Sequence, residues 1–140
     1  MSGLLIVDDA ALMRMKIRGV AEEAGWSVAG EAANGIEAVA SFHDLRPDLV
    51  TMDLVMPRLD GLAALRAIRS EVPDAKIVMV SAVDQKEKLK ECIDAGAVDF
   101  IVKPFDPDRL REFFERYLSK DSANAADSST NPNASRREPA

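Results

Sequence analysis

Five polar residues of this chain each stand at the end of a short apolar stretch, and their types together could carry out phosphoryl chemistry. They are Asp8, Asp9, Asp53, Ser81 and Lys103. Three carboxylates that lie close together repel one another, and a hard cation with oxygen ligands relieves this repulsion. Mg²⁺ suits such a site, because it takes one or two carboxylates and also accepts phosphate oxygens. A lysine and a hydroxyl could hold two further phosphoryl oxygens, which leaves one carboxylate to act as a nucleophile and form an acyl phosphate.

The residues around Asp53 place its carboxylate at the end of a buried strand. The run from Leu49 to Met52 is short, apolar and partly β-branched, as in strands that are buried on both faces. Met56-Pro57 prevents a helix from starting at once, since a residue before proline avoids the α region, and Asp60 is placed to cap the next helix. In open α/β sheets, ligands bind at the carboxyl ends of the strands, so Asp53 is a candidate for chemistry.

Apolar runs and helical periodicity alternate along the chain and predict five strands and five helices. The strands are expected at residues 4–7, 27–32, 49–52, 76–81 and 98–102, with 27–32 at an edge. The helix caps are expected at Asn34 with Glu37, at Asp60, at Asp84 with Glu87, and at Asp106 before Pro107. This alternation implies a parallel sheet that is covered on both faces. All its strands then end at the same edge, so the five polar residues should converge there.

Composition narrows the class of protein. The formal net charge of −6 disfavours direct binding to nucleic acid, and no run approaches the roughly 20 apolar residues that a membrane span needs. Met1-Ser2-Gly3 leads straight into a strand, so we expect no signal peptide, and the single Cys92 excludes an internal disulfide. These features predict a cytoplasmic protein with one domain at 1–120, and we expect it to be a monomer. Residues 121–140 contain no large apolar residue and are predicted to form a disordered tail.

Several motifs of the sequence resemble the receiver domain of two-component response regulators. They are Val7-Asp8-Asp9, the residues 52–57, Asp60-Gly61, Val80-Ser81-Ala82, Ala95-Gly96-Ala97 and the residues 100–105. The resemblance covers nearly all of residues 3–120, and residues 8–15 with Ser81-Ala82 are similar to the stand-alone chemotaxis regulators of the CheY type. It implies a flavodoxin-like (βα)5 fold, a three-layer α/β sandwich around a parallel five-stranded sheet with strand order 2-1-3-4-5.

The resemblance implies roles for the acidic residues. Asp53 would accept a phosphoryl group from a histidine kinase of the CheA type. Asp9, Asp53 and the backbone carbonyl of Val55 would bind Mg²⁺ (or Mn²⁺) directly, whereas Asp8 would act mainly through metal-bound water. Metal and phosphoryl group would therefore share one site.

The resemblance also implies how phosphorylation is sensed. Ser81 would hydrogen-bond the phosphoryl group and Lys103 would form an ion pair with it, and the Lys103-Pro104 peptide bond is expected to be cis, which proline permits at low cost. Phe100 would turn inward when Ser81 moves. The fourth helix, the fifth strand and the fifth helix would then form the surface that partners recognise.

Two positions predict slow loss of the phosphoryl group. In this family, the residues two after the phosphoacceptor and two after the hydroxyl residue influence attack by water. Here they are Val55 and Val83, and neither side chain can orient a hydrolytic water. The sequence therefore predicts a long-lived phosphoryl group on Asp53 in the absence of a phosphatase.

The expected function is that of a single-domain response regulator in chemotaxis, with the flagellar motor switch as one candidate target. A receiver portion of a larger regulator, with a DNA-binding output for example, or a phosphorelay intermediate stays open as an alternative, as does dimerisation on phosphorylation. A phosphatase of the haloacid dehalogenase type is disfavoured, because its nucleophile follows the first strand and has a second Asp two residues on, where this chain has Val55. We expect no enzyme in the ordinary sense, only a protein that promotes its own phosphorylation and dephosphorylation.

Overall fold

The computed structural model of the protein describes residues 2–130, with side chains described as far as Leu118. Strands and helices alternate along the chain. The strands are β1 (Gly3–Val7), β2 (Ser27–Ala32), β3 (Leu49–Asp53), β4 (Ile77–Ala82) and β5 (Asp99–Lys103). The helices are α1 (Ala11–Glu23), α2 (Gly35–Leu45), α3 (Gly61–Glu71), α4 (Lys86–Asp94) and α5 (Pro107–Thr130).

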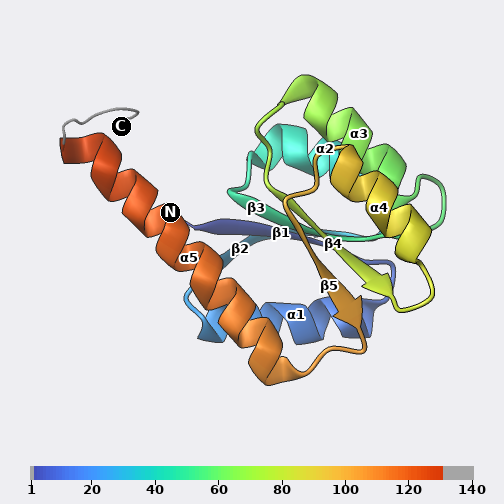
Figure 1. The fold of residues 1–140 in the computed structure, drawn as a ribbon, viewed down its shortest axis with the longest axis horizontal. Coiled ribbons are helices and arrows are strands. Elements are labelled where there is room, and N and C mark those ends of the chain that lie inside the picture. Colours follow the sequence, from blue (N-terminus) through green and yellow to red (C-terminus); the bar gives the residue numbers. More distant parts are fainter. Residues whose placement is uncertain (1, 131–140) are drawn as a thin grey trace.

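The five strands form one parallel sheet in the order β2-β1-β3-β4-β5, which confirms the predicted strand order and the edge position of β2. Helices α1 and α5 cover one face of the sheet, and α2, α3 and α4 cover the other (Figure 1). The predicted flavodoxin-like, three-layer α/β sandwich is therefore confirmed.

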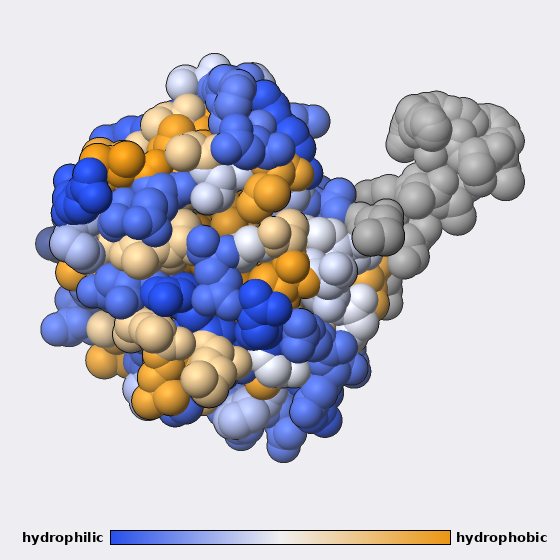
Figure 2. All heavy atoms as spheres, turned by 180° about the vertical axis from the view of Figure 1, so that it is seen from behind, coloured by the Kyte–Doolittle hydropathy of each residue, from blue (hydrophilic) through white to orange (hydrophobic). Residues whose placement is uncertain are grey.

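Each layer of helices packs on its own hydrophobic core. In β1, Leu5 and Val7 belong to the core under α2, α3 and α4, whereas Leu4 and Ile6 belong to the core under α1 and α5. Because both faces are covered, the positions of a central strand are mostly apolar on both faces. The face opposite to that of Figure 1 shows small apolar groups between hydrophilic residues (Figure 2), and no helix within residues 2–130 is long and apolar enough to cross a membrane.

Three of the four predicted helix caps are confirmed. The Asn34 side chain accepts a hydrogen bond from the Glu37 amide, and Asp60 accepts one from the Ala63 amide. The Asp106 carboxylate accepts a hydrogen bond from the Asp108 amide, one residue after Pro107. These side chains satisfy amide groups that have no partner within the first helical turn.

The prediction that Asp84 caps α4 is wrong. Helix α4 begins at Lys86 after Gln85, which makes no side-chain cap hydrogen bond. Gln85 Oε1 instead accepts a hydrogen bond from the Ala82 amide at the end of β4, at 2.9 Å. The turn after β4 is thus closed by the Gln85 side chain, which folds back onto the strand. The sequence pattern placed the cap at Asp84, one residue before Gln85, the residue that precedes α4.

The ends of several elements differ from the predicted ones: β1 begins one residue earlier, at Gly3, and β3 ends one residue later, at Asp53. Strands β4 and β5 each begin and end later than predicted, so Lys103 is the last residue of β5. Helix α5 continues to Thr130 and thereby includes the first ten residues of the predicted tail at 121–140. The prediction for the tail rested on the absence of residues that could be buried, and burial does not decide whether a helix continues locally. Residues 131–140 lie outside the described residues, and for them the tail stays a prediction.

Candidate functional site

The three aspartates predicted to form a metal site meet at the carboxyl edge of the sheet. Asp53 ends β3, and Asp8 and Asp9 directly follow β1, its neighbour in the sheet. One carboxylate oxygen from each of the three residues lies within 4.8 Å of the others. A set of three carboxylates with this spacing offers the oxygen ligands that Mg²⁺ and Mn²⁺ prefer, so the residues present fit the predicted metal.

Asp8 and Asp9 differ in how their carboxylates are engaged. Asp8 is buried, its Oδ1 accepts a hydrogen bond from the Ala10 amide at 2.9 Å, and its Oδ2 accepts one from Lys103 Nζ at 3.0 Å. Asp9 is exposed. Asp8 therefore has a protein donor on each oxygen, whereas Asp9 is open to a ligand from solvent.

Lys103 joins two of the carboxylates. Its Nζ lies 3.0 Å from Asp8 Oδ2 and 3.4 Å from Asp53 Oδ1. Burial by itself would lower the pKa of Lys103, but the hydrogen bond that Lys103 donates to Asp8 and the charges of Asp53 and Asp8 outweigh it and raise that pKa. The lysine is consequently positively charged at neutral pH.

The surroundings raise the pKa of the Asp53 carboxyl well above its usual range. Burial is the main cause that raises its pKa to about 6, the negative charge of Asp8 adds to this, and Lys103 opposes it. Only 11% of the Asp53 side chain is exposed, so the ionised form lacks most of its hydration. An ionised Asp53 therefore gains when a cation or a covalent bond removes part of its charge.

Ser81 offers a buried hydroxyl beside this group. It lies in β4, one residue beyond Val80, which is the partner of Asp53 in the sheet. Its Oγ is buried and has no hydrogen-bond partner among the described residues. A buried hydroxyl without a partner costs about 1–3 kcal/mol, and a phosphoryl oxygen on Asp53 would supply an acceptor. Thr51 Oγ1 is orphaned in the same way, and the sequence analysis did not single it out.

The loop that follows Asp53 is held in place through Gly61. The Gly61 amide donates to the Leu54 carbonyl at 2.9 Å, and a Cβ atom at Gly61 would lie 2.3 Å from the Asp53 carbonyl oxygen. Only glycine allows this approach, which explains the Asp60-Gly61 pair of the sequence. The predicted cis peptide bond between Lys103 and Pro104 is confirmed.

The two valines that were predicted to slow hydrolysis are both exposed. Val55 is 59% exposed and Val83 is 63% exposed. They stand two residues after Asp53 and Ser81, respectively, so the loops beside the site present apolar side chains to solvent.

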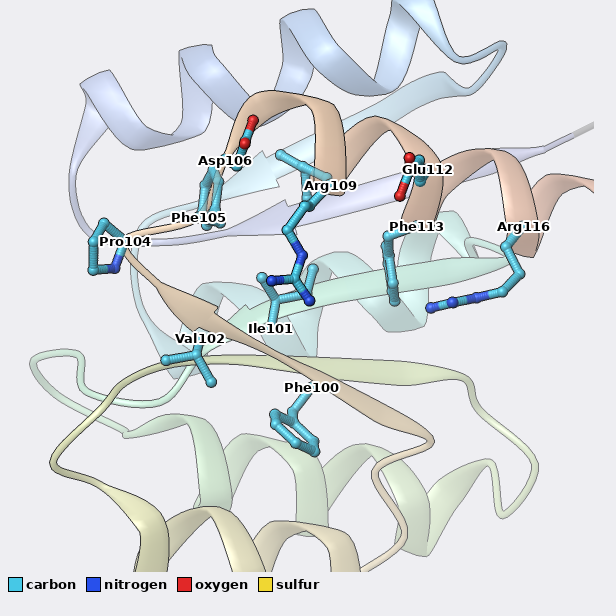
Figure 3. A pocket seen from close by; sticks show the side chains of 11 residues that line it. Phe100, Ile101, Val102, Pro104, Phe105, Asp106, Arg109, Glu112, Phe113 and Arg116 are labelled. Atoms are coloured by element: carbon cyan, nitrogen blue, oxygen red, sulfur yellow. The ribbon is translucent and has the colours of Figure 1, made fainter.

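Phe100 is also exposed, at 45%, and lies between two hollows of the surface. One, of about 480 Å³, is lined by Ser81 and by Leu89 and Ile93 of α4. The other, of about 670 Å³, is lined by residues of β5 and α5 that include Arg109 and Arg116 (Figure 3). Phe100 thus stands next to a space that also contacts the buried Ser81.

One site contact had no signal in the sequence. Arg14 of α1 donates from Nη1 to the backbone carbonyl of Asp8 at 2.6 Å. An arginine one turn into a helix is ordinary, and no spacing rule connects it with the loop before that helix. The contact is visible only once the fold is known.

Comparisons with known proteins agree with this arrangement. The model of the response regulator receiver domain family matches residues 4–115. The CheY chemotaxis protein of Thermotoga maritima is 51% identical over 109 residues, which cover 78% of this chain and 91% of that protein, and the CheY of Bacillus subtilis is 47% identical over 116 residues, which cover 83% and 97%. A chain of the CheX-CheY-BeF3-Mg²⁺ complex from Borrelia burgdorferi superposes with a TM-score of 0.76 and 32% identity over 84% of this chain and 87% of that one. This chain therefore belongs to the response regulator receiver domain family.

Proposed function

We propose that this protein is a chemotaxis-type response regulator in which Asp53 accepts a phosphoryl group from a histidine kinase. The observation that carries the proposal is the group of three carboxylates within 4.8 Å with Lys103 bonded to two of them. Mg²⁺ would be held by Asp9, Asp53 and the carbonyl of Val55, and Asp8 would act through metal-bound water. The two protein donors on Asp8 and the exposure of Asp9 support this division.

The transfer step follows from the groups that surround Asp53. An Asp53 carboxylate oxygen attacks phosphorus, the bond between phosphorus and the kinase histidine breaks, and the imidazole leaves with the electron pair. A divalent cation held by Asp9, Asp53 and the Val55 carbonyl would supply positive charge that offsets the carboxylate and phosphoryl charges. Lys103 stays within reach of both Asp8 and Asp53 and pairs with a phosphoryl oxygen, while the Ser81 hydroxyl donates to another.

Phosphorylation would change the surface made by α4, β5 and α5. Movement of Ser81 towards the phosphoryl group enlarges the hollow that it shares with Phe100, and the Phe100 ring can then turn inward. A CheA-like kinase and a downstream target such as the flagellar motor switch are the partners we propose, because the relatives that this chain resembles over most of their length bear the name CheY. The protein would work as a monomer, with dimerisation on phosphorylation as an open variation.

The protein would release no separate product and would not be an enzyme in the ordinary sense. Its own groups promote phosphorylation of Asp53 and, slowly, hydrolysis. The exposed Val55 and Val83 support slow hydrolysis, since neither can hydrogen-bond an attacking water.

The experiment that tests this function is intact-mass measurement after incubation with Mg²⁺ and acetyl phosphate. The native chain should gain the mass of one phosphoryl group, and Asp53→Asn should gain none. Asp44→Asn is the matched control, because it removes an exposed carboxylate of α2 outside the site, and it should behave like the native chain. A gain in Asp53→Asn, or none in a native chain with bound Mg²⁺, would contradict the proposal.

A further inference from the structure

Arg14 connects α1 and β2 with the backbone of the acidic loop. Its Nη1 donates to the Asp8 carbonyl at 2.6 Å, and its Nε donates to Glu31 Oε1 at 2.9 Å. The Arg14 side chain is only 18% exposed. A short hydrogen bond from a charged donor, shielded from water in this way, belongs to the stronger contacts in proteins.

Glu31 is itself held from two sides. Its other oxygen, Oε2, accepts a hydrogen bond from Arg18 Nε at 2.8 Å. The hydrogen bond from Arg18 is the main cause that lowers the pKa of Glu31, with Arg14 adding to it. Glu31 therefore stays ionised and fixes the direction of the Arg14 guanidinium, whose planar fork can bind two acceptors at once.

The backbone of Asp8 is thereby anchored at both of its polar groups. The Asp8 amide donates to the Ala32 carbonyl of β2 at 3.1 Å, and the Asp8 carbonyl accepts from Arg14. The Asp8 carbonyl belongs to the peptide unit that leads into Asp9. Rotation of this peptide unit would move the Asp9 carboxylate away from Asp53. The hydrogen bond from Arg14 therefore restricts the position of Asp9, the exposed carboxylate of the three.

We propose that Arg14 is a positioning residue, which through its bond to the Asp8 carbonyl holds the Asp8-Asp9 peptide in the orientation that binds the divalent cation. The proposal rests on the proposed function, since it assumes a metal at Asp8, Asp9 and Asp53. Groups of this kind, which orient metal ligands without touching the metal, typically change metal affinity about 10- to 100-fold when they are removed.

Arg18 provides a matched control for Arg14. It lies one turn further along α1, carries the same charge and binds the same Glu31 carboxylate. It donates hydrogen bonds to Glu31 and Glu22, and it makes no hydrogen bond with Asp8 within the described residues. Arg14→Met and Arg18→Met remove the same charge from nearly the same place, so a difference between them isolates the contact with the Asp8 carbonyl.

The test is isothermal titration calorimetry of the whole chain with MgCl₂, together with urea unfolding in EDTA. We expect Arg14→Met to weaken Mg²⁺ binding about tenfold, Arg18→Met to change it less than threefold, and Arg14→Lys, which keeps one donor for the carbonyl, to recover part of the loss. In the presence of saturating Mg²⁺, the rate of phosphorylation by acetyl phosphate should recover in Arg14→Met, because the defect is in metal affinity.

Three outcomes would overturn the proposal. Equal Mg²⁺ affinity in Arg14→Met and the native chain would do so, as would an equal loss in the two methionine variants. A lower stability in EDTA without a change in Mg²⁺ affinity would mean that Arg14 only holds α1 and β2 together. If the native chain itself bound no Mg²⁺, the proposed function would fail first and this proposal with it, and that result is distinct from these three.

Discussion

Replacing Asp53 by asparagine removes one negative charge from a group of three carboxylates, and the structure gives the size of the effect. Burial and the charge of Asp8 raise the Asp53 pKa from 3.8 to about 6. Each pKa unit corresponds to about 1.36 kcal/mol, so ionised Asp53 costs the metal-free fold about 3 kcal/mol at full ionisation. Asparagine has a similar shape and no charge, so Asp53→Asn should stabilise the metal-free protein.

The sign of the pH dependence follows from linkage. A raised carboxyl pKa means that the folded state holds its proton more tightly than the unfolded state. The cost of Asp53 is therefore absent below about pH 4, appears as the pH rises through the interval from 3.8 to about 6, and is complete above it. The advantage of Asp53→Asn should be about 1.5 kcal/mol at pH 5 and about 3 kcal/mol at pH 8.

Urea unfolding in EDTA at these two pH values measures this difference. Trp26 is a suitable fluorescent reporter, because it is buried and its indole N–H donates to the Phe114 carbonyl at 2.8 Å. The control Asp44→Asn should shift the free energy of unfolding by less than about 0.5 kcal/mol at either pH. An Asp53→Asn variant no more stable than the native chain at pH 8, or with an advantage that shrinks as the pH rises, would refute the reasoning.

Further predictions concern the loop after β3 and the lifetime of the phosphoryl group. Gly61→Ala places a Cβ atom 2.3 Å from a backbone oxygen and should lower the free energy of unfolding by at least about 2 kcal/mol. The control Gly19→Ala in α1, whose Cβ would meet nothing within 4 Å, should raise the free energy of unfolding by up to about 1 kcal/mol. Equal effects of the two substitutions in urea unfolding would contradict this prediction. The acyl phosphate on Asp53 should persist for minutes or longer in the purified, Mg²⁺-loaded protein, as followed by intact mass, and Val55→Asn or Val83→Glu should shorten its lifetime by providing a hydrogen bond to water. A half-life of seconds in the native chain would speak against the role given to the valines.

The sheet and the grouping of the aspartates could be predicted from the sequence because both follow from local patterns. Continuous apolar runs such as Leu4 to Val7 identify strands that are buried on both faces. Parallel strands end at one edge, and the strand order that the family resemblance implied places β1 beside β3, so Asp8 and Asp53 were expected to meet. The caps at Asn34 and Asp60 are equally local, since each accepts from an amide three residues on.

The remaining features depend on contacts that no local pattern contains. The turn after β4 is closed by Gln85, whose side chain competes with the expected cap at Asp84 by bonding to Ala82. The contact of Arg14 with the Asp8 carbonyl depends on how α1 packs against β2, because Glu31 of β2 accepts the second hydrogen bond of Arg14. Such contacts are set by packing, and packing is decided by the whole chain.

The cost of ionised Asp53 also explains why the site can respond to its ligands. The metal-free fold keeps three carboxylates within 4.8 Å, and Lys103 offsets only part of their repulsion. A cation bound at this place relieves the repulsion and recovers the free energy that it had cost, in addition to the free energy of coordination. The folded state therefore binds the cation more tightly than it would if the carboxylates did not repel one another. Asp53→Asn should accordingly lose much of its advantage when Mg²⁺ is added at pH 8, because 100-fold excess over the dissociation constant stabilises the native chain by about 2.7 kcal/mol and the variant by less. If Mg²⁺ raised the free energy of unfolding of both proteins equally, the carboxylate of Asp53 would not be a ligand, and the repulsion at the site would have no part in binding the metal.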